Sequence, residues 1–176
     1  MGRLLAWFGF NNYEYKVQKQ IEEIKSESPE IATMIQELEG SPYTHRILPT
    51  TSKPQKAKDW NELEKKIKSQ KNVTNPETGK SGNYRQGSVI YYNPDDNITV
   101  NGDVRDPKIG LVHEAGHAVD MDRGTIVPRK VKIDGTNVPK SEKIAIDYEN
   151  TYRKALGVPF RTTYGGIDIS PYLKFP

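Results

Sequence analysis

The sequence predicts an α+β fold in which a small β-sheet is combined with several helices. Apolar residues recur at spacings of three and four in several stretches, which is the pattern of amphipathic helices. The run from Ser88 to Tyr92 has the β-branched and aromatic content that is typical of a strand. With 176 residues, of which 34% are hydrophobic, the chain is long enough for one modest core and short for two. We therefore expect a single domain over residues 1–176.

Two helices are expected between Tyr13 and Gly40, and they form the N-terminal part, residues 1–40, of the same domain. Ser28 followed by Pro29 is a typical helix start, because a serine side chain caps free backbone N–H groups and proline fits the first turn. The second helix therefore begins there. It is expected to end at Gly40, since glycine is the usual residue at a helix C-terminus.

The middle of the chain is predicted to be mostly loop with short strands. A strand is expected from Tyr43 to Leu48. The stretch from Thr50 to Gly87 is polar and rich in turn residues, with a short helix expected from Asp59 to Ser69. The strand from Ser88 to Tyr92 follows, and Ile98 to Val100 is expected to pair with it across the turn between them.

Two further helices are expected in the last part of the chain. The first is opened by Asp106 and Pro107 and closed by Gly124, and it contains LVHEAGHAVD, residues 111–120. The second runs from Ser141 to Leu156 and is followed by another glycine and a proline, both typical of a helix end. Each helix therefore has its ends marked in the sequence.

Composition excludes several classes of protein. No apolar run approaches the length of a membrane span. The start MGRLLAWFGFNN has only a minimal basic region, a very short apolar run that Gly9 interrupts and no small-residue cleavage site, so we expect it to be mature sequence and not a secretory signal peptide. A net charge of +3 is too small to indicate a nucleic-acid-binding protein. Because the chain has no cysteine, any metal must be held by histidine, aspartate, glutamate or tyrosine.

The stretch HEAGH has the spacing of a zinc peptidase motif. On a helix His113 and His117 lie on one face, where their imidazoles can bind one tetrahedral zinc ion. Glu114 would act as the general base on a zinc-bound water, the expected nucleophile. Gly116 is expected to leave room for a strand or a ligand beside this face. The alternative is a packed helix that carries two histidines and a solvated glutamate.

The third zinc ligand is expected on the last helix. Glu149 lies within the apolar stripe of that helix, which favours a position facing the histidines. The alternative for Glu149 is a buried ion pair with Arg153, one turn later. Asp147, on the polar side of the same helix, and His45, in the first predicted strand, remain as other ligand candidates.

Two further residues are expected to support the site. Asp120 follows His117 by nearly one turn, where its carboxylate would accept the ring N–H of that histidine or bind the metal itself. A tyrosine hydroxyl is expected to stabilise the oxyanion of the tetrahedral intermediate. Tyr148, Tyr152 and Tyr164 are the candidates, and Tyr164 is preferred because the sequence RTTYGG places it in a flexible stretch.

Three stretches resemble one family of proteins. VIYYNP precedes the motif, LVHEAGHAVD contains it, and YENTYRKALGVPFRTTYG follows it. Together they resemble the HExxH effector peptidases typified by the type III secretion effector NleD, which also occur as toxin domains at the C-terminal ends of RHS-repeat proteins. The resemblance covers the last half of the chain well and the N-terminal helices only loosely.

The resemblance implies a zincin-like α+β domain with an active-site HExxH helix, a C-terminal ligand-bearing helix and a single zinc ion. It supports the two histidines as ligands and the glutamate between them as the base. The E-N-x-x-R block within it singles out Glu149, Asn150 and Arg153, the last two as residues that support the ligands.

The expected function is that of a zinc metalloendopeptidase that acts as a secreted bacterial effector or toxin and cleaves a protein in a target cell. A dedicated injection or toxin system would deliver it to the target-cell cytoplasm without a Sec signal. In a toxin-tip form, an immunity protein in the producing cell is expected; neither nucleic acid nor membrane is an expected partner. The strand edge at Val89 to Tyr92 would align an extended substrate. The alternative is a non-catalytic domain that binds zinc or a host protein.

Overall fold

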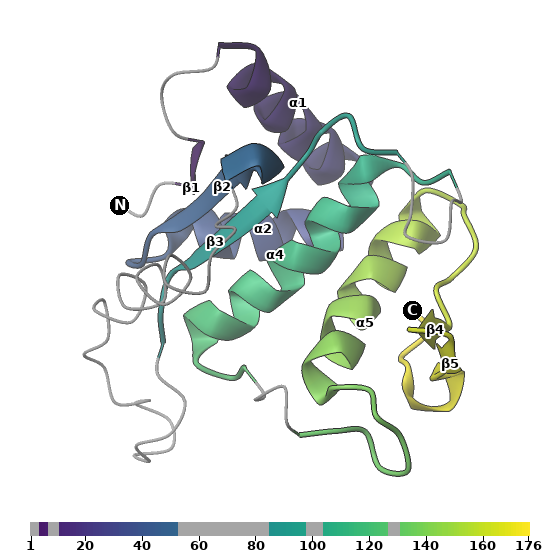
Figure 1. The fold of residues 1–176 in the computed structure, drawn as a ribbon. Coiled ribbons are helices and arrows are strands. Elements are labelled where there is room, and N and C mark those ends of the chain that lie inside the picture. The colour runs from purple at the N-terminus through teal and green to yellow at the C-terminus, as the bar shows by residue number, and fades with distance from the viewer. Residues whose placement is uncertain (1–3, 7–10, 53–84, 98–103, 127–130) are drawn as a thin grey trace.

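The computed structural model describes residues 4–6, 11–52, 85–97, 104–126 and 131–176, and it confirms the predicted α+β class. Figure 1 shows a small sheet, with helix α4 between the sheet and helix α5, and a short hairpin on the far side of α5. In chain order the elements are β1 (Leu4–Ala6), α1 (Asn11–Glu27), α2 (Pro29–Gly40), β2 (His45–Pro49), η1 (Thr50–Ser52), β3 (Ser88–Tyr92), α4 (Pro107–Arg123), α5 (Lys140–Ala155), β4 (Thr163–Tyr164), β5 (Ile167–Asp168) and η2 (Ser170–Tyr172).

The main sheet has the order β1-β2-β3, and its strands are parallel. The chain passes from β1 to β2 through α1 and α2, which is the kind of crossover that parallel strands require. The two strands predicted on either side of the long polar stretch are confirmed as β2 and β3, whereas β1 was not predicted. The helix expected at Asp59–Ser69 and the strand expected at Ile98–Val100 lie outside the described residues.

The helix ends follow the predicted capping residues. The hydroxyl of Ser28 accepts a hydrogen bond from the backbone N–H of Ile31 at the start of α2. At the start of α4, Asp106 accepts a bond from the N–H of Lys108, 2.9 Å away. Gly124 ends α4 with a φ of 70°, a left-handed conformation that glycine adopts without strain. The helix that carries HEAGH is therefore fixed at both ends.

Among the residues that the structure describes, two apolar clusters form the core. The larger one lies among α1, α2, the sheet and α4, and it includes Tyr152 from α5. The smaller one joins Ile146 of α5 to Ile133 and Val138 before that helix and to Ile169 and Leu173 after the hairpin. None of the helices in the described part of the chain combines the length and the apolar character that a membrane crossing requires.

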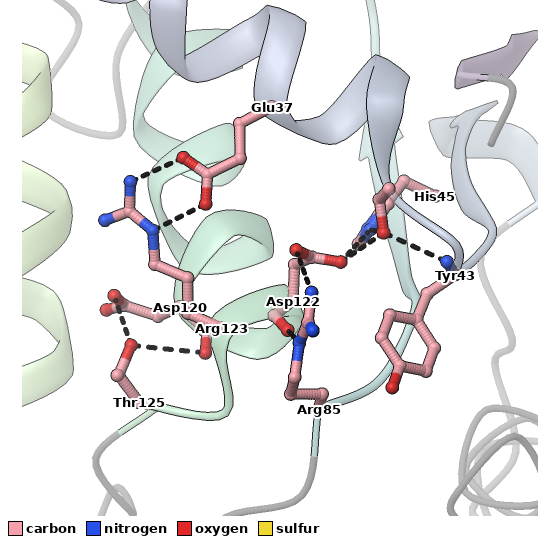
Figure 2. Close-up of polar contacts among 9 residues, drawn as sticks. Glu37, Tyr43, His45, Arg85, Asp120, Asp122, Arg123 and Thr125 are labelled. Atoms are coloured by element: carbon pink, nitrogen blue, oxygen red, sulfur yellow. Dashed lines mark hydrogen bonds and ion pairs between the residues drawn. The ribbon is translucent and has the colours of Figure 1, made fainter. Parts of the chain in front are cut away.

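A buried polar cluster links the sheet to the C-terminal end of α4 (Figure 2). His45 on β2 is 1% exposed, and its Nδ1 lies 2.9 Å from the hydroxyl of Ser88 on β3. Its Nε2 lies 3.3 Å from Oδ1 of Asp122, which also accepts a hydrogen bond from the hydroxyl of Ser41. Arg85 donates to the backbone oxygen of Asp122 at 2.7 Å. His45, one of the alternative ligand candidates, therefore has polar partners within the fold.

This cluster makes the stability of the fold depend on pH. Burial lowers the pKa of His45, and the hydrogen bond and charge of Asp122 offset this only in part. As the pH falls through about 6.5, His45 binds a proton in the unfolded chain more readily than in the folded chain. Protonation therefore favours the unfolded state: the stability contributed by neutral His45 is complete above that pH and is lost as the pH falls below it. We expect the free energy of unfolding of a His45→Gln variant to fall less than that of the wild type between about pH 7.5 and 5.5. Urea unfolding over this range tests the expectation, and equal pH slopes would contradict it.

Candidate metal centre

Three side chains from α4 and α5 converge on one point. His113 and His117 lie one turn apart on α4, with ring centroids 5.1 Å apart and ring planes at 85°. Oε2 of Glu142, in the first turn of α5, lies 3.4 Å from Nε2 of His113 and 3.6 Å from Nε2 of His117. One potential ligand atom from each residue lies within 4.8 Å of the others, so the three groups can hold one metal ion.

Glu142 was not among the residues predicted for this site. It lies about two helical turns before Glu149, on the same face of α5, and three residues before the buried Ala145. The apolar stripe of α5 therefore includes both glutamates. The stripe does not reveal which of its ends lies opposite the histidines, because that depends on how α5 crosses α4.

The charged groups of the site strongly shift one another's pKa values. Burial acts to lower the pKa of His113, but hydrogen bonds to Glu142 and Glu149 raise it to about 9. Burial acts to raise the pKa of Glu142, and hydrogen bonds to His113 and His117 hold it well below its usual value. Two ionised carboxylates thus lie on either side of one imidazole, an environment that favours a cation.

Glu149, the predicted third ligand, lies at the other ring nitrogen of His113. Its Oε2 is 3.1 Å from Nδ1, whereas Nε2 of the same ring is the nitrogen near Glu142. Glu149 is fully buried and accepts bonds from Arg153 at 2.8 Å and from Arg161 at 2.9 Å. Although burial opposes ionisation, the bond to His113 and the charges of His113 and both arginines lower its pKa to about 2. The pair with Arg153, the alternative considered for Glu149, is therefore present.

Asn150 and Arg153 both hold the segment that follows α5. The Asn150 side chain is fully buried, donates to the backbone oxygen of Arg161 at 2.9 Å and accepts from its N–H at 2.7 Å. Arg153 bonds the carboxylate of Glu149 and also the backbone oxygen of Pro159, 3.0 Å away. The E-N-x-x-R block thus connects His113 to the chain beyond α5.

Asp120 is buried near His117 at the end of the motif helix. Its Oδ1 accepts a bond from the hydroxyl of Thr125 at 3.2 Å, as Figure 2 shows. Its Oδ2 is buried and has no hydrogen-bond partner among the described residues. Burial raises the pKa of Asp120, and the Thr125 bond and the charge of His117 offset this only in part. As far as the described residues go, the carboxylate therefore keeps one oxygen available to an N–H donor.

The two predicted catalytic residues differ in their surroundings. Glu114 is exposed, and its charge contributes to the raised pKa of His113. Tyr164 lies on β4, packs against the smaller apolar cluster, and has its ring 5.7 Å from the guanidinium of Arg161. Tyr164 is thus connected to the three converging side chains only indirectly, through the Arg161 side chain that bonds Glu149.

Asp147, another ligand candidate, has its own partners. It forms an ion pair with Lys143 and accepts a bond from the backbone N–H of Lys174, 2.8 Å away. These contacts attach the C-terminal segment to α5.

Gly116 permits a close approach of α4 and α5. A Cβ atom at this position would lie 2.8 Å from Cδ2 of Tyr148 and 3.4 Å from Cα of Ala145. The room beside the ligand face is therefore occupied by a neighbouring helix, instead of the expected strand or ligand. This approach sets the distance at which Glu142 faces the histidines.

A Gly116→Ala substitution is expected to destabilise the fold. Alanine improves helix propensity by about 1 kcal/mol, but overpacking at a helix contact costs about 1–3 kcal/mol. We expect a net decrease in the free energy of unfolding, measured with denaturant. Gly40→Ala is the control, because a Cβ there meets nothing within 4 Å. A Gly116→Ala variant as stable as the control would contradict this expectation, because it would show that α4 and α5 can move apart without lowering the free energy of unfolding.

Comparison with known proteins places this chain in a family. The sequence matches the Peptidase_M91 family, described as effector protein, over residues 3–164. No curated protein and no solved structure matches the chain significantly. The match extends over the N-terminal helices as well as over the motif, and it ends at residue 164, within the first half of the segment after α5. The family resemblance seen in the sequence is thus confirmed, and the chain belongs to the Peptidase_M91 family of effector proteins.

Proposed function

We propose that this effector peptidase is a zinc-dependent metalloendopeptidase whose ligands are His113, His117 and Glu142. The observation that carries the proposal is the convergence of these three side chains, with ligand atoms within 4.8 Å of one another. Two imidazole nitrogens and one carboxylate oxygen are a donor set that suits zinc, and three protein ligands leave a fourth position open. In this proposal Glu142 takes the ligand role that was expected of Glu149 from the sequence.

Zinc held by these residues would lower the pKa of a bound water and polarise the carbonyl of the scissile bond. The side chains of the protein supply the remaining functions. Glu114, which is exposed beside His113, takes up the proton of the attacking water and passes it to the leaving amine. The hydroxyl of Tyr164 donates a hydrogen bond to the developing oxyanion.

The buried carboxylates orient the ligands in this proposal. Glu149 accepts the Nδ1–H of His113, which leaves Nε2 of that ring free to bind the metal. The unpartnered oxygen of Asp120 is suited to the same role for His117. Each histidine would then have its own carboxylate partner, distinct from the proposed ligand Glu142.

The effector family implies a protein substrate in a host cell and delivery into that cell. We propose that the substrate binds as an extended strand along β3. Within the described residues, β3 pairs with β2 along one edge, and the motif helix α4 runs beside β3 in Figure 1. A substrate strand that pairs with β3 would therefore lie close to the motif helix. Hydrogen bonds between backbones do not distinguish one substrate sequence from another, so pockets for the substrate side chains would determine which protein is cleaved.

Two measurements on the purified protein test the proposal. The metal content of the wild type, purified without added metal and then reconstituted, is expected to be about one zinc per chain, since a site of three ligands binds one ion. The zinc-loaded protein, incubated with a host-cell lysate, is expected to create new protein N-termini that disappear when a chelator is added. Zinc-free protein after reconstitution, or cleavage that persists in chelator, would contradict the proposal.

A further inference from the structure

Arg161 lies between α5 and β4 and connects parts of the molecule that surround the site. Its Nη1 donates to Oε2 of Glu149 at 2.9 Å, and its Nε donates to the backbone oxygen of Thr163 at 3.1 Å. Its guanidinium carbon lies 5.7 Å from the centroid of the Tyr164 ring. One side chain thus contacts both the carboxylate behind His113 and the strand that carries Tyr164.

Arg161 and Arg153 bind different oxygens of Glu149. Arg153 donates to Oε1 at 2.8 Å. Arg161 donates to Oε2, the oxygen that is also 3.1 Å from Nδ1 of His113. The position of Oε2 relative to the imidazole therefore depends directly on Arg161 and only indirectly on Arg153.

We propose that Arg161 is a positioning residue for the metal centre, which acts through Glu149 to orient His113. This inference rests on the proposed function, because it assigns His113 to the metal. The Arg161 guanidinium holds Oε2 of Glu149 where it accepts the Nδ1–H of His113. This contact fixes the plane of the His113 ring and keeps its Nε2 turned toward Glu142. Partners of this kind affect metal affinity although they do not touch the metal.

The backbone of Arg161 is held independently of its side chain. The Asn150 amide bonds both the N–H and the carbonyl oxygen of Arg161. Glu149 also keeps Arg153 as a partner when the Arg161 guanidinium is removed, so its charge is not left unpaired. A substitution at Arg161 therefore tests the side-chain contact while the segment stays in place.

The experiment measures the affinity of the full chain for zinc by competition with a chromogenic chelator. Arg161→Gln is expected to bind zinc up to about 10-fold more weakly than the wild type. This is the lower end of the roughly 10- to 100-fold loss that is usual when a direct hydrogen-bond partner of a ligand is removed, because Arg161 acts one contact further away, through Glu149. Arg161→Lys, which keeps the charge but not the forked geometry, is expected to lie between them. Arg153→Gln is expected to weaken binding less than Arg161→Gln. Lys154→Gln removes a positive charge from an exposed position at the end of α5 and is the control, expected to equal the wild type.

A spectroscopic readout separates positioning from general loss of structure. The cobalt-substituted Arg161→Gln protein is expected to show shifted d–d absorption bands, with a thermal unfolding midpoint close to that of Lys154→Gln. Should Arg161→Gln fail to fold, the Arg161→Lys variant provides the same comparison of affinity and spectrum. Zinc affinity and cobalt spectra equal to those of the control in the folded Arg161 variant would overturn the positioning role alone. A wild type that binds no zinc would overturn this role and the proposed function together.

Discussion

A Glu114→Gln substitution is expected to lower the rate of substrate cleavage by about 10²- to 10⁴-fold, the usual contribution of a positioned general base. Glutamine has nearly the same shape as glutamate but cannot take up a proton. Because Glu114 is exposed and is not one of the three converging side chains, the variant is expected to keep one zinc per chain, as zinc proteins do when a non-ligand is changed. The measurement compares the appearance of new N-termini in a host-cell lysate with the zinc content of the same preparation.

Glu22→Gln is the matched control for this experiment. Glu22 is an exposed glutamate on α1 whose side chain bonds Gln18. The control is expected to cleave at the wild-type rate. Cleavage by the Glu114→Gln variant at the wild-type rate would show that Glu114 is not the general base. A zinc-loaded wild type that binds a host protein without cutting it would instead favour the non-catalytic alternative.

Removal of Glu142 is expected to abolish stoichiometric zinc binding. A Glu142→Ala variant retains only the two histidines of the proposed ligand set. Glu149→Gln is expected to keep the zinc with an affinity lowered about 10- to 100-fold, because it loses only a partner of His113. The affinities are measured by chelator competition on proteins whose folding has been checked by circular dichroism.

Asp147→Ala is the control for the two glutamate variants. Asp147 is on the same helix but is bound to Lys143 and to the backbone of Lys174, so full zinc binding is expected. Loss of zinc in Glu149→Gln, with full zinc in Glu142→Ala, would restore the ligand assignment made from the sequence. Equal loss in both variants would show that the two carboxylates share the metal.

The parts of the fold that local chemistry determines were predictable from the sequence. The caps at Ser28, Asp106 and Gly124 mark helix ends that the structure confirms, since each cap acts within its own turn. The strand β3 was likewise predicted from its β-branched and aromatic content. The three-residue strand β1 was not predicted, because it is stabilised by pairing with β2, which follows only after two helices in the sequence.

The site was predictable only where its residues share one helix. The HEAGH spacing identifies His113, Glu114 and His117 as a group, because helix geometry places the two histidines on one face and the chain places the glutamate directly after the first. Glu142 and Arg161 reach the same region through the packing of α5 on α4 and through the turn after α5. No periodic pattern records that packing. Gly116 was the residue of the motif that indicated close packing, although a strand or a ligand was expected there instead of α5. The E-N-x-x-R block indicated the residues around Glu149.

A crystal structure of the zinc-loaded protein, with anomalous data collected at the zinc edge, tests the proposed ligand set most directly. We expect a single strong anomalous peak within bonding distance of Nε2 of His113, Nε2 of His117 and the carboxylate of Glu142, with Glu149 still bonded to Nδ1 of His113. A peak bound by Glu149 in place of Glu142, or no peak between the two histidines, would contradict it.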